Sequence, residues 1–447
     1  MSEILDQSDL TERAERLVKA ARAAGADAAD AVCVRGMSLS VDVRLGKVEE
    51  TGRAEGDDFT LRVFVGARSA SASTNVFADP AEMATRAVAM ARAAPEDRYA
   101  GLADKDRLAS TFPDLDLLDE TIPSAEELTE AALAAEDAAR AVPGVTNSGG
   151  ASASWSLGGL VLATSHGFTG SYLRSHFGLS ASAIAGSGTT MERDHDSESK
   201  VFRSDLAVAA EIGRRAGERA VRRLNPRQVP TGRTTVVYDP RISASLIGHL
   251  AGAINGAAIA RKTSFLRDRL GERILPAGVR VSDDPLRPRG LASRPFDGEG
   301  VGPAPLDVIA DGVLATWLLD SATARELGLE TNGRAGRGGG NPSPGATNLT
   351  LHAGAQSPDE LIADVGEGLY VAELIGRGVN LVTGDYSRGA AGFAIEAGAL
   401  GHAVSEITIA GDLADMFGRL RPANDLEYRF ARNAPTVAVE GMTVGGR

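Results

Sequence analysis

The sequence predicts an α+β protein, and three observations lead to this prediction. Amphipathic segments with a helical period alternate with segments whose polar and apolar residues alternate with a period of two. Glycine is abundant, with 52 among 447 residues, which favours turns and strand ends over an all-helical bundle. The last part of the chain is rich in glycine and β-branched residues. We therefore expect N-terminal helix-plus-antiparallel-sheet units and a mostly β C-terminal domain with a few helices.

Residues 1–110 are predicted to form an N-terminal α+β domain that opens with an amphipathic helix. The helix is expected to start with Ser8 or Asp9 as its cap and to stop at Gly25. Its apolar face comprises Leu10, Ala14, Leu17, Val18 and Ala21. Three alternating segments then predict an antiparallel meander: 31–36, 38–52 and 59–74. A second helix is expected over 80–94.

A segment without periodicity, 98–124, is expected to link this domain to a middle α+β segment, 120–225, that packs with the first. Ser124 and Glu127 have the spacing of a capping box and mark the start of a helix. The elements expected next are Gly-, Ser- and Thr-rich strands within 145–202 and a closing helix over 205–224.

Prolines, a glycine and charges interrupt any regular element over 225–235, which predicts a boundary. The C-terminal domain, 231–447, follows it. Its later part alternates like successive hairpins, so we expect a mostly β core.

The composition disfavours several classes of protein. The formal net charge is −13, so a polyanion such as DNA would be repelled unless a local basic patch dominated, and no long basic patch stands out. Cys33 is the only cysteine, so no internal disulfide can form, and its apolar neighbours predict a buried strand residue. The acidic, polar start of the sequence is unlike a signal peptide. We expect a cytoplasmic protein without nucleic-acid or membrane partners.

The stretch 242–260 carries no formal charge over 19 residues, and three explanations compete for it: a membrane span, a metal-binding helix or a packing helix. Small residues recur at every fourth position and would form a low ridge on a helix: Ala244, Gly248, Gly252, Gly256 and Ala260. Each glycine costs about 1 kcal/mol relative to alanine inside a helix, so the ridge predicts close approach of another backbone. The serines, asparagine and histidine of the stretch disfavour the membrane.

His249 is the lone candidate metal ligand in this stretch, and a packed core histidine is the competing interpretation. A hydrolytic zinc site requires three protein ligands and a base. Leu250 follows His249, and Ala253, Ile254 and Asn255 fill the places where a partner ligand could fall. This helix therefore cannot form a zinc site by itself.

A turn-like segment later in the chain carries polar side chains among glycines: Gly384, Asp385, Tyr386, Arg388 and Gly389. In a functional interpretation, bare backbone binds an extended peptide by strand addition while Arg388 pairs with its carboxylate. In a structural interpretation, tight β-turns let Asp385 and Arg388 satisfy each other. The segment is thus a candidate for peptide or partner binding.

Other candidate sites have plainer explanations. Prolines in 333–345 forbid the helix that a phosphate-binding loop requires, which favours a flexible loop or an extended strand. The polarity of 191–200 favours a solvated hairpin or loop over a metal site made by His195 and Glu198. The remaining histidines are scattered singly: His166, His176, His352 and His402. No Gly-x-Ser-x-Gly motif marks a serine nucleophile.

Two segments carry a resemblance to a known family. They are TTVVYDPRISASLIGHLAGAINGAAIARKTSF, residues 234–265, and GLYVAELIGRGVNLVTGDYSRGAAGFAIEAGAL, residues 368–400. With them the chain resembles the TldD/PmbA peptidases, and the TldE (PmbA) branch in particular, across all three predicted parts. In the catalytic TldD branch the corresponding helix carries a His-Glu-x-x-x-His zinc motif, which a later cysteine completes. Here Leu250 follows His249, the helix holds no second histidine, and no cysteine follows Cys33.

The resemblance implies a non-catalytic, metal-free subunit that pairs with a TldD-like, zinc-bearing subunit to enclose a chamber that cleaves peptides or unfolded segments. This chain would bind no cofactor, and zinc is expected in the partner. Two other functions stay open: a regulatory protein-binding factor, since the family is also named as a modulator of DNA gyrase, and a self-sufficient metallopeptidase with dispersed ligands. The isolated chain could also form a homodimer.

Overall fold

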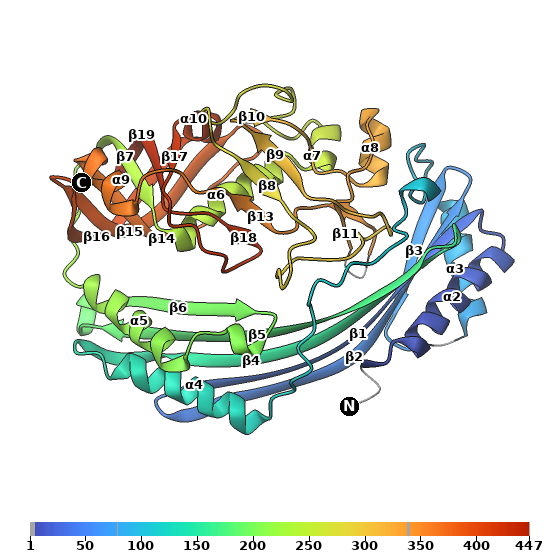
Figure 1. Cartoon of the computed structure of the whole chain (residues 1–447), viewed down its shortest axis with the longest axis horizontal. Coiled ribbons are helices and arrows are strands. Elements are labelled where there is room, and N and C mark those ends of the chain that lie inside the picture. Colours follow the sequence, from blue (N-terminus) through green and yellow to red (C-terminus); the bar gives the residue numbers. More distant parts are fainter. Residues whose placement is uncertain (1–4, 78, 338–339, 447) are drawn as a thin grey trace.

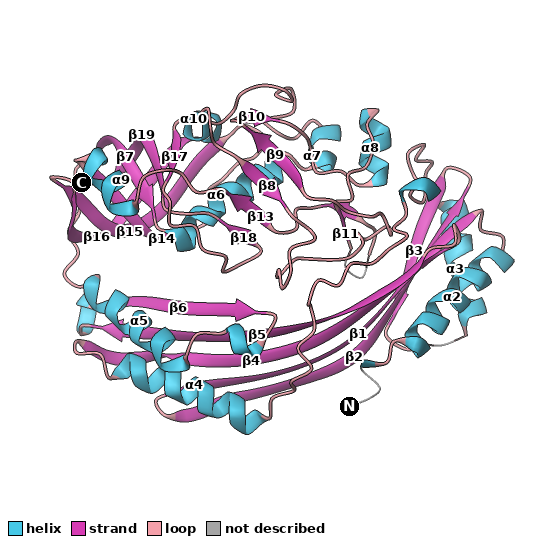
Figure 2. Ribbon diagram, viewed as in Figure 1, coloured by secondary structure: helices cyan, strands magenta, loops and turns pink. Residues whose placement is uncertain are grey.

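The computed structural model of the chain describes residues 5–77, 79–337 and 340–446. A long, curved sheet from the first half of the chain lies beneath a C-terminal unit of shorter strands and helices (Figure 1). Two pairs of helices pack on the long sheet, one near each end, and the concave side of the sheet faces the C-terminal unit (Figure 2). This arrangement confirms the predicted α+β class.

Antiparallel strands form the long sheet in the order β3-β2-β1-β4-β5-β6. They are β1 (Ala28–Arg44), β2 (Lys47–Val65), β3 (Arg68–Thr74), β4 (Val145–Thr164), β5 (Thr169–Ala185) and β6 (Glu192–Lys200). The predicted meander is confirmed, but its division into strands is wrong. β1 continues through Gly36, and the turn to β2 lies at Leu45 and Gly46, inside the predicted strand 38–52. Both turn residues have positive φ, 52° and 75°, which suits a two-residue hairpin. Cys33 is buried on β1, as predicted.

Two helices pack at the end of the sheet that carries β3: α2 (Ser8–Ala23) and α3 (Pro80–Ala93). α2 buries the residues that the sequence pattern predicts: Leu10, Ala14, Leu17, Val18 and Ala21. The predicted cap is wrong, because Gln7 occupies the N-cap position and makes no side-chain capping bond. Asp9 lies within the first turn instead and pairs with Arg13 at 2.9 Å.

The predicted linker 98–124 is irregular apart from a single 3-10 turn, Lys105–Arg107. It leads into α4 (Ala125–Arg140), which begins with the predicted capping box of Ser124 and Glu127.

Glycines in the second helix pair allow the two helices to approach closely. α5 (Ala209–Arg222) packs on α4, and a methyl group at Gly213 would lie 1.8 Å from the carbonyl oxygen of Ala135. At Gly217 a methyl group would lie 2.8 Å from the carbonyl oxygen of Ala139. Close helix contact through small residues therefore does occur in this chain, between α4 and α5.

The C-terminal unit contains two main sheets. The first has the order β16-β15-β14-β7-β19-β17, and a further pairing joins the end strand β16 to β19, the last strand but one at the other side. Its strands are β7 (Gly232–Tyr238), β14 (Gly368–Ile375), β15 (Asp385–Glu396), β16 (Ala399–Asp412), β17 (Leu420–Pro422) and β19 (Val437–Gly445). The second sheet consists of β8 (Val281–Asp283), β9 (Leu306–Ala310), β10 (Val313–Leu314), β13 (Leu349–Leu351) and β18 (Arg432–Asn433).

The helices of this unit are α6 (Pro240–Ala253), α7 (Gly256–Ala260), α8 (Ser321–Leu327), α9 (Pro358–Val365) and α10 (Leu413–Gly418). The buried side of α6, including Leu246 and Leu250, belongs to the same core cluster as residues of both sheets. α6 is therefore positioned by the core, which fixes the side chains on its other faces.

The segment 333–345 takes part in joining the two halves. It contains the short hairpin of β11 (Ala335–Gly336) and β12 (Ser343–Pro344), while residues 338–339 of the predicted loop lie outside the described residues. Arg337 pairs with Asp30 of β1 at 2.5 Å, and both side chains are 1% exposed. Arg334 is fully buried beside Asp283. Of the two predicted alternatives, the extended strand is confirmed for β11 and β12, whereas a flexible loop is wrong for Arg334 and Arg337, because each pairs with a buried carboxylate.

Candidate functional site

The uncharged stretch 242–260 forms two helices rather than one. α6 ends before Asn255, whose side chain accepts hydrogen bonds from backbone amides at the start of α7. Gly256 therefore belongs to a different helix from Gly248 and Gly252, and the predicted continuous ridge is wrong. Within the described residues, no helix is both long and apolar enough to cross a membrane.

The three glycines also meet different neighbours. A methyl group at Gly256 would lie 2.7 Å from the carbonyl oxygen of Leu318, which is the predicted close backbone approach. At Gly252 the nearest atom belongs to a leucine side chain, and at Gly248 it is a carbon of the Arg432 side chain at 3.8 Å. Gly248 thus leaves room for an arginine beside the middle of α6.

His249 follows directly and is half-buried. Its ring packs edge-to-face against Tyr386 of β15, with 6.0 Å between the ring centroids. Its Nε2 is buried and has no hydrogen-bond partner among the described residues. Burial, reinforced by the guanidinium groups of Arg388 and Arg432, lowers the pKa of His249, so the imidazole is neutral at pH 7. We call His249, Tyr386, Arg388 and Arg432 the His249 locus.

The locus joins two predictions that the sequence kept apart, because α6 and β15 pack in one core. Neither Arg388 nor Arg432 has a carboxylate partner among the described residues. Arg388 donates from Nε to the carbonyl oxygen of Ile375 at 3.3 Å. Asp385 accepts a hydrogen bond from the hydroxyl of Thr383 at 2.5 Å. The expected mutual pairing of Asp385 with Arg388 is therefore wrong.

The segment 384–389 offers no free strand edge. β15 lies between β14 and β16, and its first residues pair with β16 from Asp385 onwards. On the other side, the amide of Ser387 donates to the carbonyl oxygen of Gly378 at 2.6 Å. Gly384 turns the chain with a φ of 92°, and Gly389 pairs with β14 and β16. Peptide binding by strand addition here is excluded, so only the side chains remain candidates.

The donor set of the locus does not fit a hydrolytic zinc ion. It offers one imidazole, and its two guanidinium groups would repel a divalent cation. Among the residues that the structure describes, no three His, Cys, Asp or Glu side chains gather closely enough to hold a metal ion.

The other single histidines lie elsewhere. Polar contacts join His166 to the carbonyl oxygen of Ala103 (3.0 Å), His402 to Glu396 (3.2 Å) and His352 to the hydroxyl of Ser282 (2.7 Å). His176 lies on β5, where burial lowers its pKa. The pairing of Ser282 with His352 has no signal in the sequence, because 70 residues separate them and the pairing of β8 with β13 brings them together.

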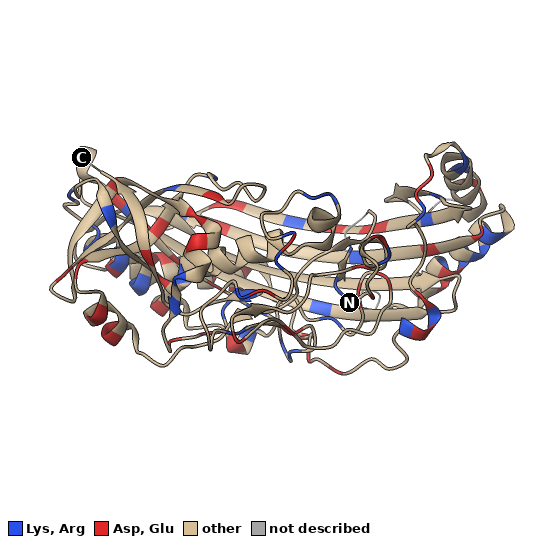
Figure 3. Cartoon of the chain, turned by 90° about the horizontal axis from the view of Figure 1, so that it is seen from above, with Lys and Arg blue, Asp and Glu red and all other residues tan. Residues whose placement is uncertain are grey.

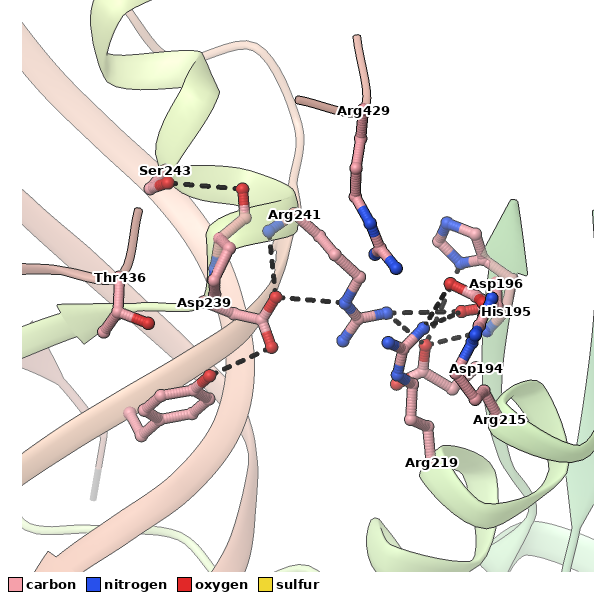
Figure 4. Close-up of polar contacts among 12 residues, drawn as sticks. Asp194, His195, Asp196, Arg215, Arg219, Asp239, Arg241, Ser243, Arg429 and Thr436 are labelled. Carbon is pink, nitrogen blue, oxygen red and sulfur yellow. Dashed lines mark hydrogen bonds and ion pairs between the residues drawn. The ribbon is translucent and has the colours of Figure 1, made fainter. Parts of the chain in front are cut away.

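The segment 191–200 is an edge strand, and Figure 4 shows its side chains meeting α5 and the start of α6. Asp194 and Asp196 are 5% and 1% exposed, so the predicted solvated hairpin or loop is wrong for them, whereas the His195 side chain is 67% exposed. A metal site shared by His195 and Glu198 is disfavoured, because residues three apart on a strand point to opposite faces.

Ion pairs account for the burial of these two aspartates. They join Arg241 to Asp194 (2.9 Å) and to Asp239 (3.0 Å), and they join Asp196 to Arg215 (2.6 Å) and to Arg219 (2.6 Å) (Figure 4). We call these six residues the Arg241 junction. Although burial opposes its charge, Asp239 and Asp194 raise the pKa of Arg241. Against its own burial, Arg219 and Arg215 lower the pKa of Asp196. The junction ties β6 and α5 to the C-terminal unit.

Family models cover most of the chain. Three PmbA/TldD models, described as PmbA/TldA metallopeptidase domains, match it: domain 1 at 29–91, the central domain at 119–224 and the C-terminal domain at 231–446. The chain is 36% identical to metalloprotease PmbA of Escherichia coli O157:H7, over 92% of this chain and 90% of that protein. It is 35% identical to the PmbA homologue of Haemophilus influenzae, over 91% of this chain and 90% of that protein.

Solved structures agree with these matches. A Bacteroides thetaiotaomicron protein named as a candidate modulator of DNA gyrase superposes with a TM-score of 0.90 and 27% identity, over 98% of this chain and 99% of that one. TldE from Thermococcus kodakarensis shares the fold, with a TM-score of 0.84 and 19% identity over 97% of this chain and 100% of that one. This chain therefore belongs to the PmbA/TldD family of metallopeptidases.

Proposed function

We propose that this chain is the metal-free subunit of a heteromeric zinc metallopeptidase of the PmbA/TldD family, acting in the cytoplasm on peptides or unfolded segments. One observation carries the proposal: the His249 locus holds one imidazole and two guanidinium groups without carboxylate partners among the described residues. A zinc hydrolase needs three ligands and an open coordination position. The zinc and the attacking water would therefore belong to a TldD-like partner.

The contribution of this chain would be shape and positioning. Small residues run in register across four strands of the long sheet: Ser40, Ser154, Gly178 and Ser199. They are half-buried and alternate with the residues that α4 and α5 cover, so they lie on the opposite face of the sheet. Such a face leaves room for an extended chain and offers hydroxyl groups to its carbonyls. Enclosure between two subunits would exclude water and folded proteins.

Arg388 and Arg432 would bind a carboxylate of the substrate at the His249 locus. A guanidinium presents a planar fork that matches a carboxylate, and both groups lack such a partner among the described residues. Tyr386 and His249 would hold this edge of the site through their ring contact.

The test is to mix the purified chain with a zinc-bearing His-Glu-x-x-x-His subunit and to follow cleavage of an unfolded peptide. We expect turnover well above that of the zinc subunit alone, and zinc analysis should find no stoichiometric metal in this chain. Turnover that never exceeds that of the zinc subunit would contradict the proposal. Stoichiometric zinc and cleavage by this chain alone would instead support a self-sufficient enzyme.

A regulatory function is the second candidate, because the Bacteroides structural neighbour is named as a candidate modulator of DNA gyrase. Acidic and basic residues are interspersed along both halves of the chain (Figure 3), and the net charge is −13. Direct contact with DNA is disfavoured by this charge, so such regulation would act through a protein partner. A homodimer of the isolated chain, detected by light scattering without a zinc subunit, would be compatible with this function.

A further inference from the structure

A cavity of about 400 Å³ opens on the second C-terminal sheet, and its lining includes no residue of the His249 locus. Side chains from β8, β9 and the segments beside them line it, including Arg280, Ser282, Arg287, Asp307 and His352. A neighbouring cavity of about 270 Å³ shares Arg287 with it. The two cavities are therefore adjacent and share this arginine in their walls.

Arg287 has an unusual environment for a half-buried cation. Its guanidinium carbon lies 3.1 Å from the ring centroid of Tyr428, so one face of the group is stacked on an aromatic ring. No carboxylate pairs with it among the described residues. The nearby Asp284 carboxylate accepts the amide of Leu286 at 2.9 Å instead. Arg287 is thus held in place by Tyr428, and no carboxylate pairs with its guanidinium in the part of the chain that the structure describes.

Neutral polar groups stand on the same cavity wall. The Ser282 hydroxyl and His352 Nε2 are 2.7 Å apart, which fixes both side chains on adjacent strands. Arg280 is already neutralised by Asp307, at 2.7 Å. Arg287, which forms no direct ion pair with any described residue, and two hydrogen-bonding groups therefore face the same space as Asp284.

The smaller cavity is lined mainly by basic residues, although the whole chain carries −13, whereas two arginines and two aspartates balance in the lining of the larger cavity. Further basic residues line the smaller cavity: Lys200, Arg289 and Arg429. They outnumber the acidic residue in that lining, Asp205. A local positive region in an acidic protein concentrates anions at that place.

We propose that this cavity binds a small organic carboxylate, with Arg287 as its ionic anchor and the Ser282 hydroxyl, which His352 orients, as its hydrogen-bond donor. The planar guanidinium fork matches both oxygens of a carboxylate, whereas a lysine would act as a point charge. The proposal does not depend on the peptidase function, because the cavity and the His249 locus share no residue.

The proposal has a pH signature. Burial lowers the pKa of His352, Arg280 lowers it further, and Asp307 opposes both. The other charged groups lining the cavity are Asp284 and Arg287. Protonation of His352 adds a positive charge to the cavity, so a carboxylate should bind more tightly as the pH falls, and bound carboxylate should raise the pKa of His352.

Isothermal titration of the full chain with N-acetylglycine tests the proposal, and N-acetylglycinamide, which lacks the charge, serves as the matched ligand. We expect the acid to bind at least about tenfold more tightly than the amide, and tightening below pH 6.5, the ordinary pKa of histidine. Arg287→Gln should weaken binding of the acid by about tenfold or more. The control Arg53→Gln, on an exposed arginine of β2, should change it less than about twofold.

Several outcomes would overturn the proposal. They are equal binding of acid and amide, no loss in Arg287→Gln, tighter binding of inorganic phosphate than of the acid, or no binding heat up to about 10 mM, where even a ~1 mM site is occupied. Unfolding midpoints of wild type and Arg287→Gln separate a lost site from a lost fold. Arg287→Lys, which keeps the charge without the fork, should recover only part of the affinity.

Discussion

Arginines gather at both the Arg241 junction and the His249 locus, but their charges are matched at only one of them. At the junction, Arg241 faces two carboxylates at 2.9 and 3.0 Å. At the locus, Arg388 and Arg432 face a neutral imidazole and have no carboxylate partner among the described residues. Matched arginines fasten two parts of a protein, whereas unmatched ones leave binding capacity for a ligand.

Solvation explains why the molecule tolerates both arrangements. A buried charge is costly unless it is paired, and the nearly inaccessible Asp194 and Asp196 meet arginines from α5 and α6. Arg432 is exposed, so water can solvate it without a partner. The comparison therefore predicts that changes at matched, buried pairs affect stability, and that changes at the locus affect ligand binding and titration.

The largest effect is expected at Asp30, a nearly inaccessible carboxylate that pairs with two arginines. It pairs with Arg337 and Arg62 at 2.5 Å each, and the arginine side chains are 1% and 9% exposed. Asp30→Ala leaves both cations buried without a carboxylate, so we expect a loss of about 3–5 kcal/mol in the free energy of unfolding. Urea denaturation measures it. Asp9→Ala, which breaks the more exposed pair with Arg13, should cost under about 1 kcal/mol, and equal losses would contradict the comparison.

Glu299 lies where acids outnumber the nearby cations, which is the opposite of the charge imbalance at the His249 locus. Burial and the neighbouring Asp297 raise the pKa of Glu299 to about 7, from an ordinary 4.5. The folded protein then holds more protons than the unfolded protein between these values, so stability falls as the pH rises from 4.5 to 7. The full linkage is up to about 3 kcal/mol, at 1.36 kcal/mol per unit of pKa.

Denaturation curves of wild type and Glu299→Gln across this pH range measure the effect. Glutamine can still accept the hydrogen bond from the amide of Ser321, at 2.8 Å in the wild type, but it does not titrate. Its stability should therefore depend less on pH, and an unchanged slope would show that another group is responsible.

At the Arg241 junction, Asp194→Asn removes the charge that faces Arg241 across the two halves. The amide keeps the shape but weakens a charge-assisted hydrogen bond, so we expect a loss of about 2 kcal/mol in stability. His195→Gln changes the exposed neighbour and should alter stability by less than about 0.5 kcal/mol. Equal losses of stability in both variants would show that the ion pair of Asp194 with Arg241 does not stabilise the contact between the two halves.

Sequence patterns predict those features of this fold that depend on local repetition. The five buried residues of α2 follow from the helical period alone, and the capping box at Ser124 follows from a spacing of three residues. The hairpin turn at Leu45 and Gly46 was missed because it lacks the usual Asn-Gly or Asp-Gly signal. The alternation of polar and apolar residues predicts strands in this region, but it does not locate the turn between them.

Charge matching and the candidate site could not be predicted in the same way. In the sequence, Asp194 and Asp196 resemble solvated acids. Arginines of α5 and α6, distant in the sequence, offset the free-energy cost of burying them. His249 and Tyr386 were each candidates, but their contact requires the packing of α6 on β15. Asparagine favours N-caps over helix interiors, so Asn255 is a signal for the break, but the uncharged run continues on both sides of it and conceals the boundary.

The smallest effect on stability, and the most specific test of the locus, is expected from Arg388→Gln. Arg388 is half-buried, and one carbonyl oxygen, that of Ile375, accepts its hydrogen bond, so the free energy of unfolding should change by less than about 1 kcal/mol. Burial and then Arg388 are the main causes that lower the pKa of His249, so removing this charge should raise that pKa towards the ordinary 6.5. Titration of the imidazole Cε1 proton by NMR measures the shift, with Arg53→Gln as the distant control. A change in stability without any shift in the titration would show that Arg388 acts only in packing. The charge of Arg388 would then give no support for ligand binding at the locus.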